Sequence, residues 1–126
     1  MASVLIVDDS DLGRVVLGGM FSGSNFKTIL FAVNGEDAFE KAITHKPDLI
    51  ILDVMMPYLD GIDVTQMIRL HKEIYNTPIL IATALDDRET SLRAIKAGAN
   101  DVIVKPFNKA KLLALAEKLV NEVKSK

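Results

Sequence analysis

The sequence contains no cysteine, no long apolar run and no excess of charge of one sign. Without cysteine the chain has no disulfide and no thiolate metal site. No apolar run approaches the roughly 18 residues of a membrane-spanning helix. The N-terminal stretch MASVLIVDDS has no basic segment and reaches an acidic pair too early for a signal peptide. These absences favour a cytoplasmic protein without a membrane segment.

The charge balance argues against nucleic acid as a direct partner. The chain has 15 basic and 17 acidic residues and a formal net charge of -2, whereas a nucleic-acid-binding surface needs a clear positive excess. Its 126 residues, of which 49% are hydrophobic, suffice for one globular domain with a sizeable core. We therefore expect a single domain spanning residues 1–126.

Five short apolar runs, each followed by a segment of helical period, repeat along the chain. Their length and β-branched content are typical of buried strands, and they occupy residues 3–7, 28–33, 49–52, 78–83 and 102–105. Asn108 is placed to cap the last helix, Asp60 opens the third, and Gly98 ends the fourth as a left-handed cap. The pattern predicts an α/β doubly wound fold with helices on both faces of a parallel five-stranded sheet.

The carboxyl ends of these strands carry several polar residues. Ligands of doubly wound folds bind outside this edge, where the strand order reverses. Asp8 and Asp9 follow the first strand, Asp53 follows the third, Thr83 ends the fourth and Lys105 ends the fifth. Taken alone, each has a structural explanation as a helix cap, a strand threonine or a loop lysine. Their conjunction at one edge predicts a functional site.

Asp53 raises the sharpest question, because it interrupts the apolar stretch PDLIILDVMMP at residues 47–57. An unpaired carboxylate in such surroundings costs several kcal/mol. Three aspartates and one lysine at this edge leave two negative charges, which a divalent cation cancels. Because Mg²⁺ prefers oxygen ligands and keeps several waters, it suits a few carboxylates and a carbonyl. A magnesium ion is therefore the expected cofactor.

At these residues the sequence resembles the receiver domain of bacterial two-component response regulators. The resemblance covers essentially the whole chain and rests on four motifs in order: VLIVDDS at 4–10, PDLIILDVMMPYLDG at 47–61, PILIATA at 78–84 and GANDVIVKPF at 98–107. It implies a flavodoxin-like fold with strand order 2-1-3-4-5. It also implies a phosphorelay protein with two kinds of partner, a sensor histidine kinase or histidine phosphotransfer protein and a downstream effector protein or domain.

The resemblance further implies a metal-ligand set. By it, Asp53 is the phosphorylated residue and a metal ligand, Asp9 is a direct ligand, and the carbonyl of Met55 is a further ligand. Asp8 mainly orients a metal-bound water.

The phosphoryl group is expected to contact Thr83 and Lys105, while Ala84 is small enough to admit it. The Lys105–Pro106 peptide bond is expected to be cis. A carboxylate is a recognised nucleophile toward phosphoryl groups, and the transfer needs positioning and charge neutralisation more than a general base. The chain is therefore expected to assist its own phosphorylation and dephosphorylation without being an enzyme, and His45 and His71 have no catalytic role.

Three alternatives stay open. A small Mg²⁺-dependent aspartyl phosphatase usually carries a second acid two residues after the nucleophile, where this chain has Met55. A flavodoxin needs a hydroxyl-rich phosphate loop after its first strand, where DDSDLG would repel phosphate. The third alternative is the receiver domain of a longer regulator, with an effector domain after Lys126.

Two further expectations concern surfaces. The resemblance places Val16, Leu17, Met20 and Phe21 of the first helix against the sheet. It leaves Leu12 and Val15 exposed beside the acidic pair, as a candidate docking site for the phosphodonor. Receiver domains also usually carry an aromatic residue three positions before the lysine, where this chain has Val102. Valine is stiff and short, so we expect the conformational response to concentrate in residues 83–90.

Overall fold

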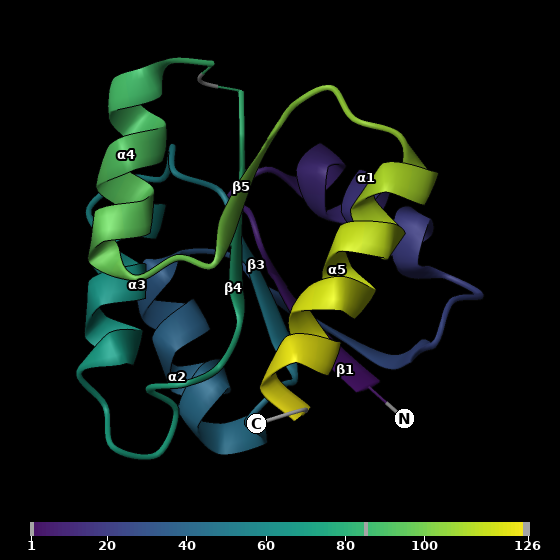
Figure 1. Ribbon diagram of the computed structural model, residues 1–126, viewed down its shortest axis with the longest axis horizontal. Coiled ribbons are helices and arrows are strands. Elements are labelled where there is room, and N and C mark those ends of the chain that lie inside the picture. The colour runs from purple at the N-terminus through teal and green to yellow at the C-terminus, as the bar shows by residue number, and fades with distance from the viewer. Residues whose placement is uncertain (1, 85, 125–126) are drawn as a thin grey trace.

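The computed structural model describes residues 2–84 and 86–124, in which strands and helices alternate along the chain (Figure 1). The strands are β1 (Ala2–Val7), β2 (Phe26–Ala32), β3 (Leu49–Leu52), β4 (Ile79–Thr83) and β5 (Asp101–Val104). The helices are α1 (Asp11–Phe21), α2 (Gly35–His45), α3 (Gly61–Arg69), α4 (Arg88–Ala97) and α5 (Lys109–Lys124). Each predicted strand is present, with its ends shifted by no more than about two residues, as is usual for sequence-based boundaries.

The strands form one parallel sheet in the order β2-β1-β3-β4-β5. This is the flavodoxin-like order, so the predicted fold class is confirmed. Since the order reverses at β1, strands β1 and β3 are neighbours, and Val7 lies opposite Leu52 at their carboxyl ends. The residues that follow, Asp8 and Asp53, therefore leave the sheet side by side.

Helices cover both faces of the sheet, as Figure 1 shows with α2, α3 and α4 on one side and α1 and α5 on the other. Alternate residues of a strand point to opposite faces. In β1, Leu5 and Val7 pack with the first helix group, while Val4 and Ile6 pack with the second. This burial on both faces explains why the strands are hydrophobic without alternation.

Polar side chains begin each helix named above by accepting a hydrogen bond from a backbone N–H three residues later: Ser10, Asn34, Asp60, Asp87 and Asn108. Such caps satisfy backbone donors that have no partner inside the helix. Gly98 ends α4 with φ of 115°, a conformation that glycine adopts without steric cost. The predicted roles of Asp60, Gly98 and Asn108 are confirmed.

Helix α1 differs from expectation at one residue. Leu17 and Phe21 are buried against the sheet and Met20 is partly buried, whereas Leu12 and Val15 are 73% and 70% exposed, as expected. Val16, however, is 47% exposed, so its predicted inward position is wrong. Residues four apart share a helix face, and Val16 therefore lies beside Leu12 rather than beside Leu17. None of the helices in the described residues is long and apolar enough to cross a membrane.

Candidate functional site

The carboxyl edge of the sheet brings together polar residues from four strands. Asp8 follows β1, Asp53 follows β3, Thr83 closes β4 and Lys105 follows β5. One carboxylate oxygen from each of Asp8, Asp9 and Asp53 lies within 4.8 Å of the others. The residues that the sequence singled out therefore meet at one place.

The three carboxylates differ in their access to solvent. Asp8 is buried, the Asp53 side chain is 13% exposed, and Asp9 is exposed. Two like charges about 5 Å apart repel by about 3 kcal/mol at an effective dielectric constant near 20. Such a cluster is unfavourable unless cations lie close to it.

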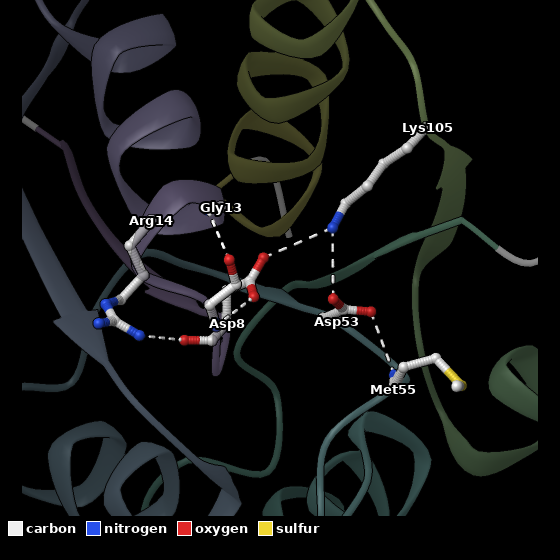
Figure 2. A network of polar contacts seen from close by, with 7 residues as sticks. Asp8, Gly13, Arg14, Asp53, Met55 and Lys105 are labelled. Atoms are coloured by element: carbon white, nitrogen blue, oxygen red, sulfur yellow. Dashed lines mark hydrogen bonds and ion pairs between the residues drawn. The ribbon is translucent and has the colours of Figure 1, made fainter.

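Lys105 supplies one cation to this cluster. Its Nζ lies 3.3 Å from Oδ2 of Asp53 and 3.5 Å from Oδ2 of Asp8, and Figure 2 shows the side chain reaching toward both carboxylates. The backbone N–H of Lys105 donates to the carbonyl of Thr83 at 2.8 Å, which fixes the base of the side chain at the edge. One ammonium leaves two of the three negative charges without compensation.

Asp53 is held at the end of β3 by several contacts. Its N–H donates to the carbonyl of Val7 at 3.2 Å, and its Oδ1 accepts the N–H of Met55 at 3.1 Å. A Cβ on Gly61 would lie 2.3 Å from the carbonyl oxygen of Asp53, so only glycine fits where the loop folds back. Burial raises the pKa of Asp53 above its ordinary value of 3.8, although the ammonium of Lys105 and the N–H of Met55 oppose this shift.

The turn between β1 and α1 holds Asp8. Its Oδ1 accepts the N–H of Ser10 at 2.9 Å, and its carbonyl accepts a hydrogen bond from Nη1 of Arg14 at 2.7 Å (Figure 2). Arg14 also pairs with Asp11. Ser10 is the N-cap of α1, so neither Asp8 nor Asp9 is needed for capping. Sequence reasoning missed Arg14, because an arginine one turn into a helix gives no distinctive signal.

The other predicted residues also lie at this edge. Thr83 is fully buried at the end of β4, Ala84 is exposed directly after it, and Met55 is exposed beside Asp53. The Lys105–Pro106 peptide bond is cis, as expected.

The two histidines lie elsewhere. His45 ends α2 and His71 follows α3, where the chain returns toward the amino ends of the strands. Neither histidine therefore lies at the carboxyl ends of the strands.

The donor set of the cluster suits a hard divalent cation. Three carboxylates supply oxygen ligands, and their uncompensated charge of two units matches that of Mg²⁺. Because one of the carboxylates is exposed, a bound ion would keep contact with water, which Mg²⁺ favours.

A cavity of about 450 Å³ opens beside the cluster, between α1 and the segment that follows β5. Its polar wall contains Asp8, Asp9, Asp53 and Lys105. Its apolar wall is formed by Leu12, Val16, Leu17, Met20, Pro106 and Phe107. The acidic site is thus reached past an apolar surface of α1.

The sequence is similar to a known domain family and to several regulatory proteins. Residues 4–117 match the response regulator receiver domain family. The chain is 41% identical to the alkaline phosphatase synthesis transcriptional regulatory protein PhoP of Bacillus subtilis over 105 residues, which are 83% of this chain and 42% of PhoP. It is 35% identical to the chemotaxis protein CheY of Thermotoga maritima over 116 residues, which are 92% of this chain and 95% of CheY. The chain therefore spans less than half of one relative and nearly all of another.

Solved structures agree with the sequence comparison. The Francisella response regulator 1452 receiver domain is similar with a TM-score of 0.88 and 31% identity, covering 98% of this chain and 99% of that one. The chemotaxis protein CheY4 of Vibrio cholerae is similar with a TM-score of 0.87 and 32% identity, covering 94% and 98%. With its strand order and carboxyl-edge cluster, this chain belongs to the response regulator receiver domain family and is a two-component phosphorelay signalling domain.

Proposed function

We propose that Asp53 accepts a phosphoryl group from a phosphohistidine donor. One observation carries the proposal: Asp53 shares its ammonium partner, Lys105, with a second carboxylate, and a third carboxylate lies within 4.8 Å. A carboxylate needed only for structure would be fully paired. This one retains a negative charge excess that an incoming cation would relieve.

In the proposed step, a carboxylate oxygen of Asp53 attacks the phosphorus of the donor. The new P–O bond forms an acyl phosphate, while the P–N bond to the imidazole breaks and the imidazole nitrogen takes up a proton. This step needs alignment and charge neutralisation rather than a base. The N–H of Met55, which donates to Oδ1 of Asp53, keeps the carboxylate oriented.

Lys105 and Thr83 are proposed to contact the phosphoryl group. Nζ of Lys105 lies 3.3 Å from Oδ2 of Asp53, so it is close enough to pair with the oxygens of a phosphoryl group attached to Asp53. The backbone N–H of Lys105 donates to the carbonyl of Thr83, so the two residues lie next to each other at the ends of β5 and β4. Ala84, with its small exposed side chain, leaves space beside Thr83. We also propose that these residues assist hydrolysis of the acyl phosphate.

Receiver domains bind Mg²⁺ at an acidic pocket, and we propose that Asp9, Asp53 and the carbonyl of Met55 hold it here, with Asp8 orienting a metal-bound water. Bound Mg²⁺ would neutralise charge on the phosphoryl oxygens. Asp9 is the exposed member of the cluster and thus the first that an ion from solvent meets. Asp8 is buried beside Lys105, and its carboxylate adds negative charge to the inner side of the proposed metal site.

Labelling with acetyl phosphate tests the acceptor assignment. In the presence of Mg²⁺, intact-mass spectrometry should show one added phosphoryl group on the wild type and none on Asp53→Asn. Asp48→Asn, at the other end of β3, is the matched control and should be labelled like the wild type. Labelling of Asp53→Asn at the wild-type rate would refute the assignment. Repeated turnover of a simple phosphoester would favour the phosphatase alternative.

Thermal unfolding tests the metal assignment separately. At a Mg²⁺ concentration 100 times the dissociation constant, binding stabilises the folded state by about 2.7 kcal/mol. Asp9→Asn should reduce this gain. An unchanged melting temperature on adding millimolar Mg²⁺ to the wild type would count against the site.

The donor is proposed to dock on the exposed face of α1. Leu12 and Val15 are 73% and 70% exposed, and Leu12 also lines the cavity that opens onto the acidic cluster. An apolar surface next to a reactive carboxylate fits the helix of a histidine phosphodonor protein. The partner that receives the output signal is an effector protein or an effector domain of a longer chain.

Replacing Leu12 with lysine tests this docking. Leu12→Lys should slow phosphotransfer from a histidine phosphodonor protein at least about tenfold, since it removes an interface contact, while acetyl phosphate labelling stays unchanged. Leu70→Lys is the control, because Leu70 is 87% exposed and lies at the C-terminal end of α3. Equal slowing of both reactions by Leu12→Lys would refute the docking surface.

A further inference from the structure

Gly13 occupies a position in α1 where the backbone does not require glycine. It lies in the first turn of the helix, and its φ is outside the left-handed region that favours glycine. In such a position glycine weakens a helix relative to alanine. An explanation for Gly13 must therefore come from what surrounds it.

The carboxylate of Asp8 fills the space that a side chain at residue 13 would need. A Cβ on Gly13 would lie 2.2 Å from Oδ2, 2.6 Å from Cγ and 3.0 Å from Oδ1 of Asp8. These distances are far shorter than a van der Waals contact. Figure 2 shows Gly13 directly beside this carboxylate.

Asp8 has little freedom to move away by shifting its backbone. Its N–H donates to the carbonyl of Ala32, and the preceding residue Val7 is buried in a strand that pairs on both sides. The carboxylate is also tied within the cluster, by the N–H of Ser10 at 2.9 Å and by Nζ of Lys105 at 3.5 Å. A side chain at residue 13 would therefore rotate the carboxylate and break these contacts.

We propose that Gly13 is a positioning residue for the phosphoacceptor site: its missing side chain creates the recess that holds the carboxylate of Asp8 toward Lys105 and Asp53. The inference rests on the proposed function where it concerns the metal, since it makes Mg²⁺ affinity depend on Gly13. The recess itself is a property of the metal-free protein.

The same helix provides two matched controls. A Cβ on Gly19 would meet nothing within 4 Å, so Gly19→Ala adds a methyl group without a clash. A Cβ on Gly18 would lie 2.8 Å from the ring of Phe31, so Gly18→Ala disturbs the packing of α1 away from the cluster. Together they separate a general effect on α1 from an effect on Asp8.

Thermal unfolding without metal tests the recess. In EDTA, Gly13→Ala should lower the melting temperature by about 5 °C, given that about 1 kcal/mol shifts it by a few degrees, while Gly19→Ala should raise it. In an Asp8→Ala background the clash is gone, and Gly13→Ala should then raise the melting temperature. Such non-additivity is the signature of two residues in contact. Equal effects of Gly13→Ala in both backgrounds would overturn the proposal.

Calorimetric titration with MgCl₂ gives an independent readout. Gly13→Ala should raise the dissociation constant at least about tenfold, a difference of about 1.4 kcal/mol, whereas Gly18→Ala and Gly19→Ala should leave it within about twofold of the wild type. Wild-type affinity in Gly13→Ala would overturn the positioning role. If the wild type itself binds no Mg²⁺, the proposed metal site fails, and the coupling in EDTA still decides the role of Gly13.

Discussion

Strand β3 is flanked by two aspartates, Asp48 at its amino end and Asp53 at its carboxyl end, and their surroundings differ in kind. Oδ2 of Asp48 accepts hydrogen bonds from Ser3, at 2.8 Å from the backbone N–H and 3.3 Å from the hydroxyl. Asp53 instead faces two other carboxylates and shares one ammonium with Asp8. The same residue type therefore completes a local network at one edge and leaves an unbalanced cluster at the other.

The cations of the two edges show the same contrast. Arg69, on the side of the amino edge, donates to the carbonyls of Gly98, Tyr75 and Thr77 and to the side chain of Asn100, at 2.7–2.9 Å. Its fixed fork of donors suits several carbonyls at once. Lys105 is a single point charge placed between two carboxylates. Polar groups with complete partners stabilise a fold, whereas groups left unbalanced at a strand edge indicate chemistry.

The largest expected effect comes from removing Arg69. Arg69→Met should lower the free energy of unfolding by about 3 kcal/mol, because several acceptors lose a charged donor. The free energy of unfolding of Arg69→Lys should fall between those of the wild type and Arg69→Met, since lysine cannot reach all four acceptors with one ammonium. Urea unfolding measures the stability.

Acetyl phosphate labelling completes the comparison between the edges. Arg69→Met should be labelled at the wild-type rate under conditions where it is folded, because the hydrogen bonds given above for Arg69 go to residues 75–77 and 98–100, which precede β4 and β5. A folded Arg69→Met protein that cannot be labelled would show that the two edges are not independent.

A smaller effect, of opposite sign at the two edges, is expected from aspartate-to-asparagine substitution. Asp48→Asn should lower stability by about 1 kcal/mol, because a charge-assisted hydrogen bond becomes neutral. Asp53→Asn should raise the melting temperature of the metal-free protein by a few degrees, because it removes a buried charge from a repulsive cluster.

The pH dependence sharpens the second half of this prediction. The pKa of Asp53 is raised in the folded protein, chiefly by burial, so the folded state binds a proton more readily than the unfolded chain. The carboxylate therefore costs stability at neutral pH, and the cost disappears as the pH falls through the raised pKa. The stability gain of Asp53→Asn in EDTA should accordingly shrink between neutral pH and the range just above 3.8. A gain that stays constant over this range would contradict the assignment to Asp53.

The fold and the acidic site were predictable from the sequence for related reasons. Continuous apolar runs that alternate with segments of helical period predict parallel strands buried on both faces. Parallel strands bring the residues that follow their carboxyl ends to one edge of the sheet. Asp8, Asp53 and Lys105 are therefore found where the strand ends place them. Contacts set by shape were not predictable: no local pattern indicates that Gly13 makes room for Asp8, or that Val16 turns outward on α1.

Arg69 belongs to the same group of unpredicted features. Its acceptors come from two separate segments, residues 75–77 and 98–100, and the backbone carbonyls among them carry no signal in a sequence. Tertiary proximity alone reveals them.

The smallest expected effect concerns the conformational response at the carboxyl edge. Val102 in β5 is partly buried and packs with the core on the face of α2, α3 and α4. Its side chain is short and has restricted rotamers, so it cannot swing between a buried and an exposed state when Thr83 moves. The movement should instead follow the backbone link from Thr83 into the segment leading to α4, of which residue 85 lies outside the described residues.

Amide shift mapping with beryllofluoride and Mg²⁺, which together mimic the phosphorylated aspartate, measures this response. The largest shifts beyond the acidic cluster are expected in residues 83–90, including the first turn of α4, where Asp87 caps the helix through Thr90. Shifts in β5 and α5 should be smaller. Val102→Tyr is the matched variant: restoring an aromatic side chain should extend the response into β5 and α5. Wild-type shifts in β5 and α5 as large as those after Thr83 would show that the response does not depend on a bulky side chain at residue 102.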